Sequence, residues 1–387
     1  MDHIVHYDPR LPAELPSPCY VVDLQRLESN LAILESIQQA TECKILCALK
    51  GFAMHSVFPL LSRSLAGVCA SGPHEARLGA ELFGREVHVF APAFSLRDME
   101  ELLPIAKHIS FNSFSQWNLH RGTIEKRNER ISCGLRVNPG YSEIDVEIYD
   151  PCAPGSRLGI PLSEFEGQSL GGIEGLHFHA LCEQNAGTLE RVLEVFISQF
   201  GQWLPQMKWV NFGGGHHITS PVYDRDRLIR ILNDFRSRFP HLEVYLEPGE
   251  AIAINTGVLA ASVLDIAGND IEIAILDISA TCHMPDTLEM PYRPEVVGAG
   301  QPGQRAYTYR LGGLSCLAGD VIGDYSFDAP LRIGDRIQFL DMAHYTMVKT
   351  TTFNGIKHPA IATWDPRSDT LNIVREFGYK DYKERLS

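Results

Sequence analysis

The sequence predicts an α/β fold: a (β/α)8 TIM-like barrel joined to a C-terminal antiparallel β domain. Up to about residue 250, eight short apolar runs alternate with helical patterns, which is typical of a barrel rather than of a doubly wound sheet. After about residue 262, alternating apolar and polar residues are broken by Gly and Pro, which is typical of antiparallel strands. A length of 387 residues suits about two domains.

The barrel elements follow from the hydrophobic periodicity. Leu24 to Ala40 is expected to be a helix, because apolar residues recur there every three or four positions. Strands are expected near residues 44–49, 66–70, 87–90, 109–111, 132–137, 173–178, 208–212 and 242–246. Helices are expected at 54–62, 73–82, 96–106, 114–122, 187–203 and 224–238. Repeated Pro and Gly make 138–165 mostly loop.

The second domain is expected to be discontinuous. Alternating runs that begin at Ile271, Arg305, Asp335 and Leu371 predict its strands. The extended segment Cys19-Tyr-Val-Val-Asp, which precedes the barrel, is expected to join them. The predicted division is therefore a barrel at 24–262 and a β-rich domain formed by 1–23 and 263–387.

Composition excludes several classes of protein. A net charge of −14 argues against binding to nucleic acid or to anionic membranes, and it is compatible with a cationic small substrate. No apolar stretch approaches the roughly 20 residues that span a bilayer, and the N-terminus lacks the features of a secretory signal. Nine singly scattered cysteines favour reduced thiols and a cytoplasmic location.

Chemically suggestive residues follow four of the predicted strands. Lys50 follows the first strand, and His177 and His179 close the sixth. Gly213 to Gly215 follow the seventh strand, and Glu247 follows the eighth. Functional groups of a barrel lie just past the carboxyl ends of its strands, so these residues are expected to lie close together.

The residue types point to a phosphorylated aldehyde as the bound group. Lys50 ends an apolar run, where desolvation would lower its pKa, and a free amine forms a Schiff base with an aldehyde. Three glycines let backbone N–H groups approach a phosphate. The carboxylate of Glu247 would keep a pyridine nitrogen protonated. The simpler alternatives are a lysine that extends to water, a tight turn and a charged strand end.

Two histidines on one strand face leave a further alternative open. His177 and His179 are two residues apart, so they could together ligate a metal, as in a metal-dependent barrel hydrolase. No nearby carboxylate motif completes such a site, so no metal is expected. An imidazole stacked on an aromatic cofactor explains His179 better.

The complete set of motifs resembles the fold-type III pyridoxal-phosphate (PLP) enzymes, which include alanine racemase and the ornithine, arginine and diaminopimelate decarboxylases. Within that family the chain is most similar to the carboxynorspermidine/carboxyspermidine decarboxylases of polyamine biosynthesis. The resemblance covers nearly the whole chain. The motifs that carry it are Ser17-Pro-Cys-Tyr-Val-Val-Asp, Ala48-Leu-Lys50-Gly, His177-Phe-His179-Ala-Leu, Asn211-Phe-Gly-Gly-Gly-His-His, Leu246-Glu247-Pro-Gly-Glu250, Leu314-Ser-Cys316 and His344-Tyr345.

The resemblance implies a role for each matched residue. Lys50 would form the Schiff base, His179 would stack on the PLP ring, Gly213, Gly214 and Gly215 with Tyr345 would bind its phosphate, and Glu247 would pair with its pyridinium. Cys316 would reach the neighbouring subunit's site and return a proton to Cα after CO2 leaves. The family therefore implies an obligate homodimer with two shared active sites.

Two departures from the family pattern favour a longer, cationic substrate. Ornithine and diaminopimelate decarboxylases carry Arg where this chain has Glu250, and the ornithine enzyme has Asp where this chain has Leu317. Glu250, Asp320 and Asp324 are the candidates for binding the polyamine end, and Arg157 is a candidate on the phosphate or ring side.

The expected reaction is decarboxylation of carboxynorspermidine, and of carboxyspermidine, to norspermidine and spermidine. A diaminopimelate- or ornithine-type decarboxylase is the first alternative. A racemase is disfavoured by Glu247, because a racemase of this fold pairs the pyridine nitrogen with Arg. A non-catalytic PLP- or partner-binding relative is disfavoured because Lys50 and Cys316 are both present.

Overall fold

The computed structural model describes residues 5, 7, 9–127 and 131–387. The chain forms two compact units: residues 30–252 make one, and the residues up to Ser29 together with Ala253–Ser387 make the other. The expected division at 24 and 262 stays a prediction. In the part of the chain that the structure describes, no helix is both long and apolar enough to cross a membrane.

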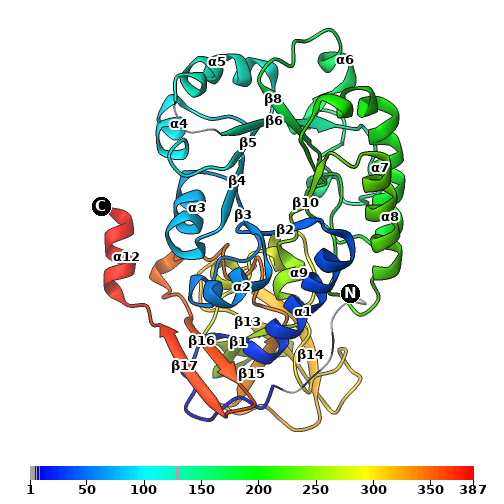
Figure 1. The fold of residues 1–387 in the computed structure, drawn as a ribbon. Helices are drawn as coiled ribbons and strands as arrows, with labels where there is room; N and C mark the ends of the chain where they lie inside the picture. The colour runs from blue at the N-terminus through cyan, green and yellow to red at the C-terminus, as the bar shows by residue number, and fades with distance from the viewer. Residues whose placement is uncertain (1–4, 6, 8, 128–130) are drawn as a thin grey trace. The chain divides into compact units, whose positions relative to one another are not determined.

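Unit 30–252 contains a closed barrel of eight parallel strands, as predicted (Figure 1). Each strand pairs with its neighbours in the order β2, β3, β4, β5, β6, β8, β9, β10, and β10 pairs with β2 to close the ring. The two-residue strand β7 (Ile160–Pro161) only extends β6. The barrel strands are β2 (Lys44–Ala48), β3 (Gly67–Ala70), β4 (Glu86–Phe90), β5 (His108–Phe111), β6 (Ser132–Asn138), β8 (Ile173–His177), β9 (Trp209–Asn211) and β10 (Glu243–Leu246).

Helices cover the outside of the ring of strands, as Figure 1 shows for α4, α5, α7 and α8. Their starts are fixed by side chains that accept backbone N–H groups: Ser95 caps α4, Asn185 caps α7 and Asp224 caps α8. The helices associated with the barrel are α1 (Leu24–Thr41), α2 (Phe58–Ser64), α3 (Pro73–Leu78), α4 (Leu96–Leu102), α5 (Phe114–Glu125), α6 (Leu162–Phe165), α7 (Ala186–Phe200), α8 (Arg225–Arg238) and α9 (Glu250–Ala253).

The other unit is built on a sheet of eight strands. The order is β14-β13-β12-β11-β1-β16-β17, and β15 also pairs with β11. The expected strand at 19–23 is β1 (Cys19–Asp23), and it pairs with both β11 and β16. The remaining strands are β11 (Gly257–Asn269), β12 (Ile271–Leu276), β13 (Tyr307–Gly312), β14 (Val321–Phe327), β15 (Arg336–Leu340), β16 (Ala360–Asp365) and β17 (Thr370–Arg375).

The sheet is mixed rather than purely antiparallel. β1 runs parallel to β16, and β12 runs parallel to β13, while the other pairs are antiparallel. Tyr20, Leu259 and Phe339 belong to the buried cluster on one face of the sheet. Short helices α10 (Ala280–His283) and α11 (Asp286–Glu289) and the terminal α12 (Tyr379–Leu386) complete the unit.

Candidate active site

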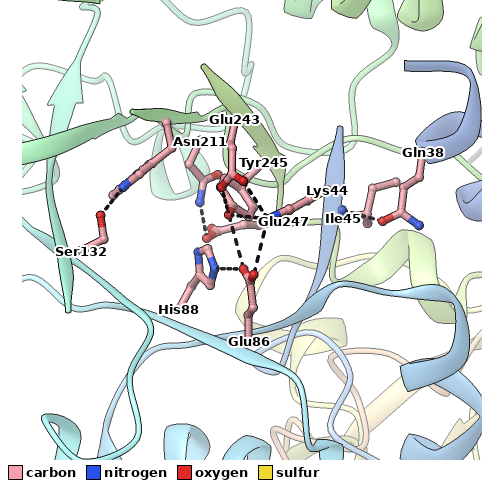
Figure 2. A network of polar contacts seen from close by, with 11 residues as sticks. Gln38, Lys44, Ile45, Glu86, His88, Ser132, Asn211, Glu243, Tyr245 and Glu247 are labelled. Atoms are coloured by element: carbon pink, nitrogen blue, oxygen red, sulfur yellow. Dashed lines mark hydrogen bonds and ion pairs between the residues drawn. The ribbon is translucent and has the colours of Figure 1, made fainter. Parts of the chain in front are cut away.

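Glu247 is a buried carboxylate at the carboxyl end of the barrel. It follows β10, and Oε1 accepts a hydrogen bond from Nδ2 of Asn211 at 2.6 Å (Figure 2). Asn211 ends the neighbouring strand β9, and its Oδ1 accepts the N–H of Gly213 at 2.8 Å. One buried amide therefore fixes both the carboxylate and the start of the glycine loop.

The loop Gly213–Gly215 requires glycine at each position. Gly213 and Gly215 have φ of +70° and +82°, which side chains rarely adopt. A Cβ on Gly214 would lie 2.5 Å from the carbonyl oxygen of Glu247. A Cβ on Gly215 would lie 2.0 Å from the carbonyl oxygen of Leu181. The loop therefore brings bare backbone against the end of β10.

His179 is a neutral imidazole held against this loop. Its Nδ1 accepts the N–H of Gly214 at 2.9 Å, so a neutral ring carries its proton on Nε2. Burial, reinforced by the positive charges of Lys50 and Arg136, lowers the pKa of His179 well below its ordinary value. The ring is therefore uncharged at neutral pH, as stacking on an aromatic ligand requires.

His177 lies deeper in the barrel than its neighbour. Its Nε2 is 3.6 Å from Oε2 of Glu247, and its ring meets Phe90 edge-on. Burial lowers the pKa of His177 to about 4, against the opposing effect of Glu247. His177 therefore packs against Glu247 and Phe90 inside the barrel.

Lys50 lies in the turn directly after β2. The turn packs on the loop that carries Glu247, because Ala48 N–H donates to the Pro248 carbonyl at 3.0 Å and a Cβ on Gly51 would lie 2.8 Å from Gly249 Cα. One expectation was wrong: the Lys50 side chain is exposed, not desolvated, because the strand ends two residues earlier.

Arg136 is a buried residue of this site that the sequence analysis missed. It lies on β6, where its guanidinium donates to the carbonyl of His179 at 3.3 Å and covers the ring of Phe90 at 4.5 Å. Burial lowers the pKa of Arg136 to about 10, while Glu247 opposes that change. A lone charge within the apolar run Leu135-Arg-Val137 was the signal that could have revealed it.

The two polar candidates at the rim of the barrel differ in their surroundings. Oε2 of Glu250 lies 2.9 Å from Nε2 of His217. Arg157 is exposed in the loop after β6, and its carbonyl accepts a hydrogen bond from Nδ2 of Asn112 at 2.7 Å. The binding roles expected for Glu250 and Arg157 stay predictions.

Cys316 and Tyr345 both belong to the sheet unit. Cys316 is exposed in the loop between β13 and β14, and its N–H donates to Oδ1 of Asn354 at 2.8 Å. Tyr345 has a φ of +42°, a conformation that side chains rarely adopt and that tends to occur at functional positions. Their roles in proton transfer and phosphate binding stay predictions.

The two expected substrate carboxylates of the sheet unit already have partners. The buried Asp320 accepts the N–H groups of Ala280 and Ser315 at 2.7 and 2.9 Å. Asp324 accepts two hydrogen bonds from the guanidinium of Arg310, at 2.7 and 3.0 Å. The structure thus gives both carboxylates a structural task, and their role in substrate binding stays a prediction.

Comparison with known proteins assigns the chain to one family. The family model described as "Pyridoxal-dependent decarboxylase, C-terminal sheet domain" matches residues 19–343. The chain is 49% identical to the carboxyaminopropylagmatine decarboxylase of Synechocystis sp., over 98% of this chain and 97% of that protein. It is 44% identical to the carboxynorspermidine/carboxyspermidine decarboxylase of Campylobacter jejuni, over 96% and 99% of the two chains.

A solved structure extends this similarity to the fold. The crystal structure of carboxynorspermidine decarboxylase from Campylobacter jejuni, complexed with norspermidine, superposes with a TM-score of 0.88 at 43% sequence identity. The match covers 96% of this chain and 100% of that chain.

Proposed function

This chain belongs to the pyridoxal-dependent decarboxylases, and from that premise we propose that it decarboxylates carboxynorspermidine and carboxyspermidine to norspermidine and spermidine. Its relatives at 44% and 49% identity are named for substrates that all carry a carboxyaminopropyl group on a polyamine or agmatine. The shared reaction is therefore loss of CO2 from the α-amino acid end of such a molecule.

The barrel residues fit the family's cofactor, pyridoxal phosphate. The glycine loop has no room for side chains, so it presents bare backbone, which suits a phosphate, and a buried carboxylate is fixed beside it. When bound, pyridoxal phosphate supplies an electron sink for the pair released as the bond from Cα to the carboxylate breaks. The residues that would hold it are Lys50, His179, Gly213–Gly215, Glu247 and, from the sheet unit, Tyr345.

The chain's own residues would then each have a defined task. Asn211 holds the Glu247 carboxylate in one position, so that it can keep a proton on the pyridine nitrogen. The neutral ring of His179 would lie flat against the cofactor. The amine of Lys50 would bind the cofactor aldehyde between turnovers, and the Cys316 thiol would deliver a proton to Cα. The buried Glu247 held by Asn211 is the observation that carries this proposal.

The cationic remainder of the substrate needs an acidic partner. Glu250 supports this requirement, since it places a carboxylate, paired with His217, where the ornithine and diaminopimelate enzymes have Arg. A second candidate substrate is carboxyaminopropylagmatine, because the relative at 49% identity is named for it. The two candidates differ at the distal end, which is an amine in one and a guanidine in the other.

We also infer the setting in which the enzyme works. The exposed Cys316 supports a homodimer in which each subunit completes the other's active site. Free thiols at all nine cysteines, each of which lies in the described part of the chain, support a cytoplasmic location.

The decisive experiment measures CO2 release by the purified enzyme from five substrates. These are carboxynorspermidine, carboxyspermidine, carboxyaminopropylagmatine, ornithine and diaminopimelate. We expect the carboxypolyamines to give the highest kcat/KM, with the first two within about 200-fold of each other, because they differ by one methylene. A preference for ornithine or diaminopimelate would overturn the proposal, and a preference for carboxyaminopropylagmatine would select the second candidate.

A further inference from the structure

The amino end of the barrel, opposite the candidate active site, carries a second cluster of ionisable side chains, formed by two buried histidines and a half-buried glutamate. Glu86 and His88 are the first and third residues of β4, so both point to the same face of the strand. His108 begins β5 and is the register partner of His88 on the neighbouring strand. The strand pairing thus brings two imidazoles and one carboxylate together inside the barrel.

The three side chains are close enough to share a ligand. One ligand atom from each of Glu86, His88 and His108 lies within 4.8 Å of the other two. Nε2 of His88 is 3.1 Å from Oε2 of Glu86 (Figure 2). Nδ1 of His108 is buried and has no hydrogen-bond partner among the residues that the structure describes. An unpartnered buried nitrogen is costly, and a ligand would remove that cost.

We propose that Glu86, His88 and His108 form a binding site for a divalent transition metal, with Zn²⁺ as the best match. Two imidazoles and one carboxylate are a common zinc ligand set, which leaves one position for water. Mg²⁺ is disfavoured because it prefers oxygen ligands in an octahedral arrangement.

Metal binding requires a limited rearrangement of the cluster. The rings of His88 and His108 stack, with centroids 4.1 Å apart and planes 13° apart. Zinc bonds of about 2.0–2.2 Å draw the three ligand atoms closer, so the rings must turn until their nitrogen lone pairs converge. Trp209 and Tyr245 pack beside the rings and limit this motion to small rotations.

The ammonium group of Lys44 already pairs with the carboxylate of Glu86. Its Nζ lies 3.4 Å from Glu86, 3.1 Å from Glu243 and 3.3 Å from the hydroxyl of Tyr245. The side chains of Lys44 and Glu243 are 35% and 54% exposed, so an ion from solvent can reach the cluster there. A metal on Glu86 would compete with this ammonium group.

The competition between Lys44 and a metal ion provides a test, because two lysine variants should differ in their affinity for Zn²⁺. Lys44→Met removes the competing charge, and we expect it to tighten Zn²⁺ binding by about tenfold or more. Lys208→Met is the matched control: Lys208 lies directly before β9 at the same barrel end, and it pairs with Glu174 instead. We expect no change in Zn²⁺ affinity in this control.

The experiment is equilibrium dialysis of the full-length holoenzyme against Zn²⁺, with metal measured by mass spectrometry. We expect the double variant His88→Gln/His108→Gln to bind one Zn²⁺ fewer per chain than the wild type. The cysteines, common to all variants, give the same background. Magnesium should not bind in any variant. Equal zinc content in the wild type and the double variant would overturn the proposal.

A second measurement covers the case in which the double variant fails to fold. Co²⁺ added to the wild type should give visible absorption bands of a nitrogen- and oxygen-ligated tetrahedral site, and Glu86→Gln should remove them. Bands that survive in Glu86→Gln, or that show only thiolate-to-metal charge transfer, would place the ion elsewhere. Because this site uses neither Lys50 nor Glu247, its test is independent of the proposed decarboxylation.

Discussion

The two ends of the same barrel both contain a glutamate beside a histidine, yet they are built differently: Glu247 is buried, whereas Glu86 is half-buried. At the carboxyl end, Glu247 lies 3.6 Å from His177 and is fixed by an amide, Asn211. At the amino end, Glu86 lies 3.1 Å from His88 and is reached by an ammonium group, Lys44. Glu247 follows β10 and His177 is the last residue of β8, whereas Glu86 and His88 are the first and third residues of β4.

The two ends also differ in what surrounds their ionisable groups. At the carboxyl end, glycines replace side chains around the carboxylate and leave backbone next to it. At the amino end, aromatic rings of Trp209 and Tyr245 fill the equivalent space. Ionisable groups alone therefore do not mark a cofactor site; the bare backbone of the glycine loop beside Glu247 is what distinguishes the carboxyl end.

The largest expected effect comes from removing the lysine at the carboxyl end, Lys50. Lys50→Ala should lower kcat by about three orders of magnitude or more, because the cofactor loses its covalent attachment. The measurement is CO2 release together with the absorbance of the bound aldehyde. Lys208→Met, at the amino end, is the control and should keep near wild-type activity. Equal losses in both variants would show that the effect is structural.

Removing one charge from the carboxyl end should have the next largest effect. Glu247→Gln should lower kcat by about a hundredfold, because a neutral amide stabilises a pyridinium less well. Glu174→Gln, a matched change at the amino end, should alter kcat by less than about twofold. The readouts are kcat and the spectrum of the bound cofactor. A normal rate in Glu247→Gln would remove this residue from the mechanism.

The close packing around the glycine loop can be tested by adding one methyl group. Gly214→Ala places a Cβ 2.5 Å from the Glu247 carbonyl, so it should weaken pyridoxal phosphate binding by at least tenfold and destabilise the barrel by about 1–3 kcal/mol. Fluorescence titration of the apoenzyme and thermal unfolding measure the two effects.

Gly122→Ala provides the control for the added methyl group. Gly122 lies in the exposed part of α5, and a Cβ added there would meet no atom within 4 Å, so alanine should stabilise the helix by up to about 1 kcal/mol. Unchanged cofactor affinity in Gly214→Ala would contradict the close fit inferred for the loop.

The smallest effect is a change in the pH dependence of stability. The pKa of His177 falls from its ordinary 6.5 to about 4 on folding, because burial disfavours the charged ring. Between these values the unfolded chain binds the extra proton, so stability is present above pH 6.5 and is lost as pH falls toward 4. His177 alone contributes up to about 3 kcal/mol to that loss.

His177→Gln should therefore flatten the curve of unfolding free energy against pH between 6.5 and 4, measured by urea denaturation at each pH. His55→Gln changes an exposed histidine and should leave the slope unaltered. If the His177 variant keeps the wild-type slope, the histidine is not buried in solution.

The barrel was predictable from sequence because each parallel strand is buried on both sides. Such strands form continuous apolar runs, and the run at 242–246 corresponds to β10 with only one residue of difference. The sheet unit was harder. β11, β14 and β16 were missed, and the parallel pairing of β12 with β13 depends on how distant segments meet rather than on local alternation.

Prediction of the candidate site was limited in the same way, because contacts between distant segments leave little local pattern. Residues at strand ends could be predicted, because topology brings every such end to one place. Asn211 could not, because its bond to Glu247 joins two distant segments, and Arg136 left only one signal, a lone charge in an apolar run, whose meaning depends on its partners. The exposure of Lys50 was missed for a similar reason, since it depends on where the strand stops and the turn begins.

The pairing of β1 has a consequence for how the chain is made. Cys19 leaves the ribosome early, but its partner Ala260 on β11 comes 241 residues later, and Ala360 on β16 later still. At a synthesis rate of about 5–20 residues per second, roughly 12 to 48 seconds pass between the synthesis of Cys19 and that of Ala260. During that time residues 30–252 can fold, while an apolar strand stays without its partners. Chaperone contact during synthesis should therefore concentrate on the first 23 residues.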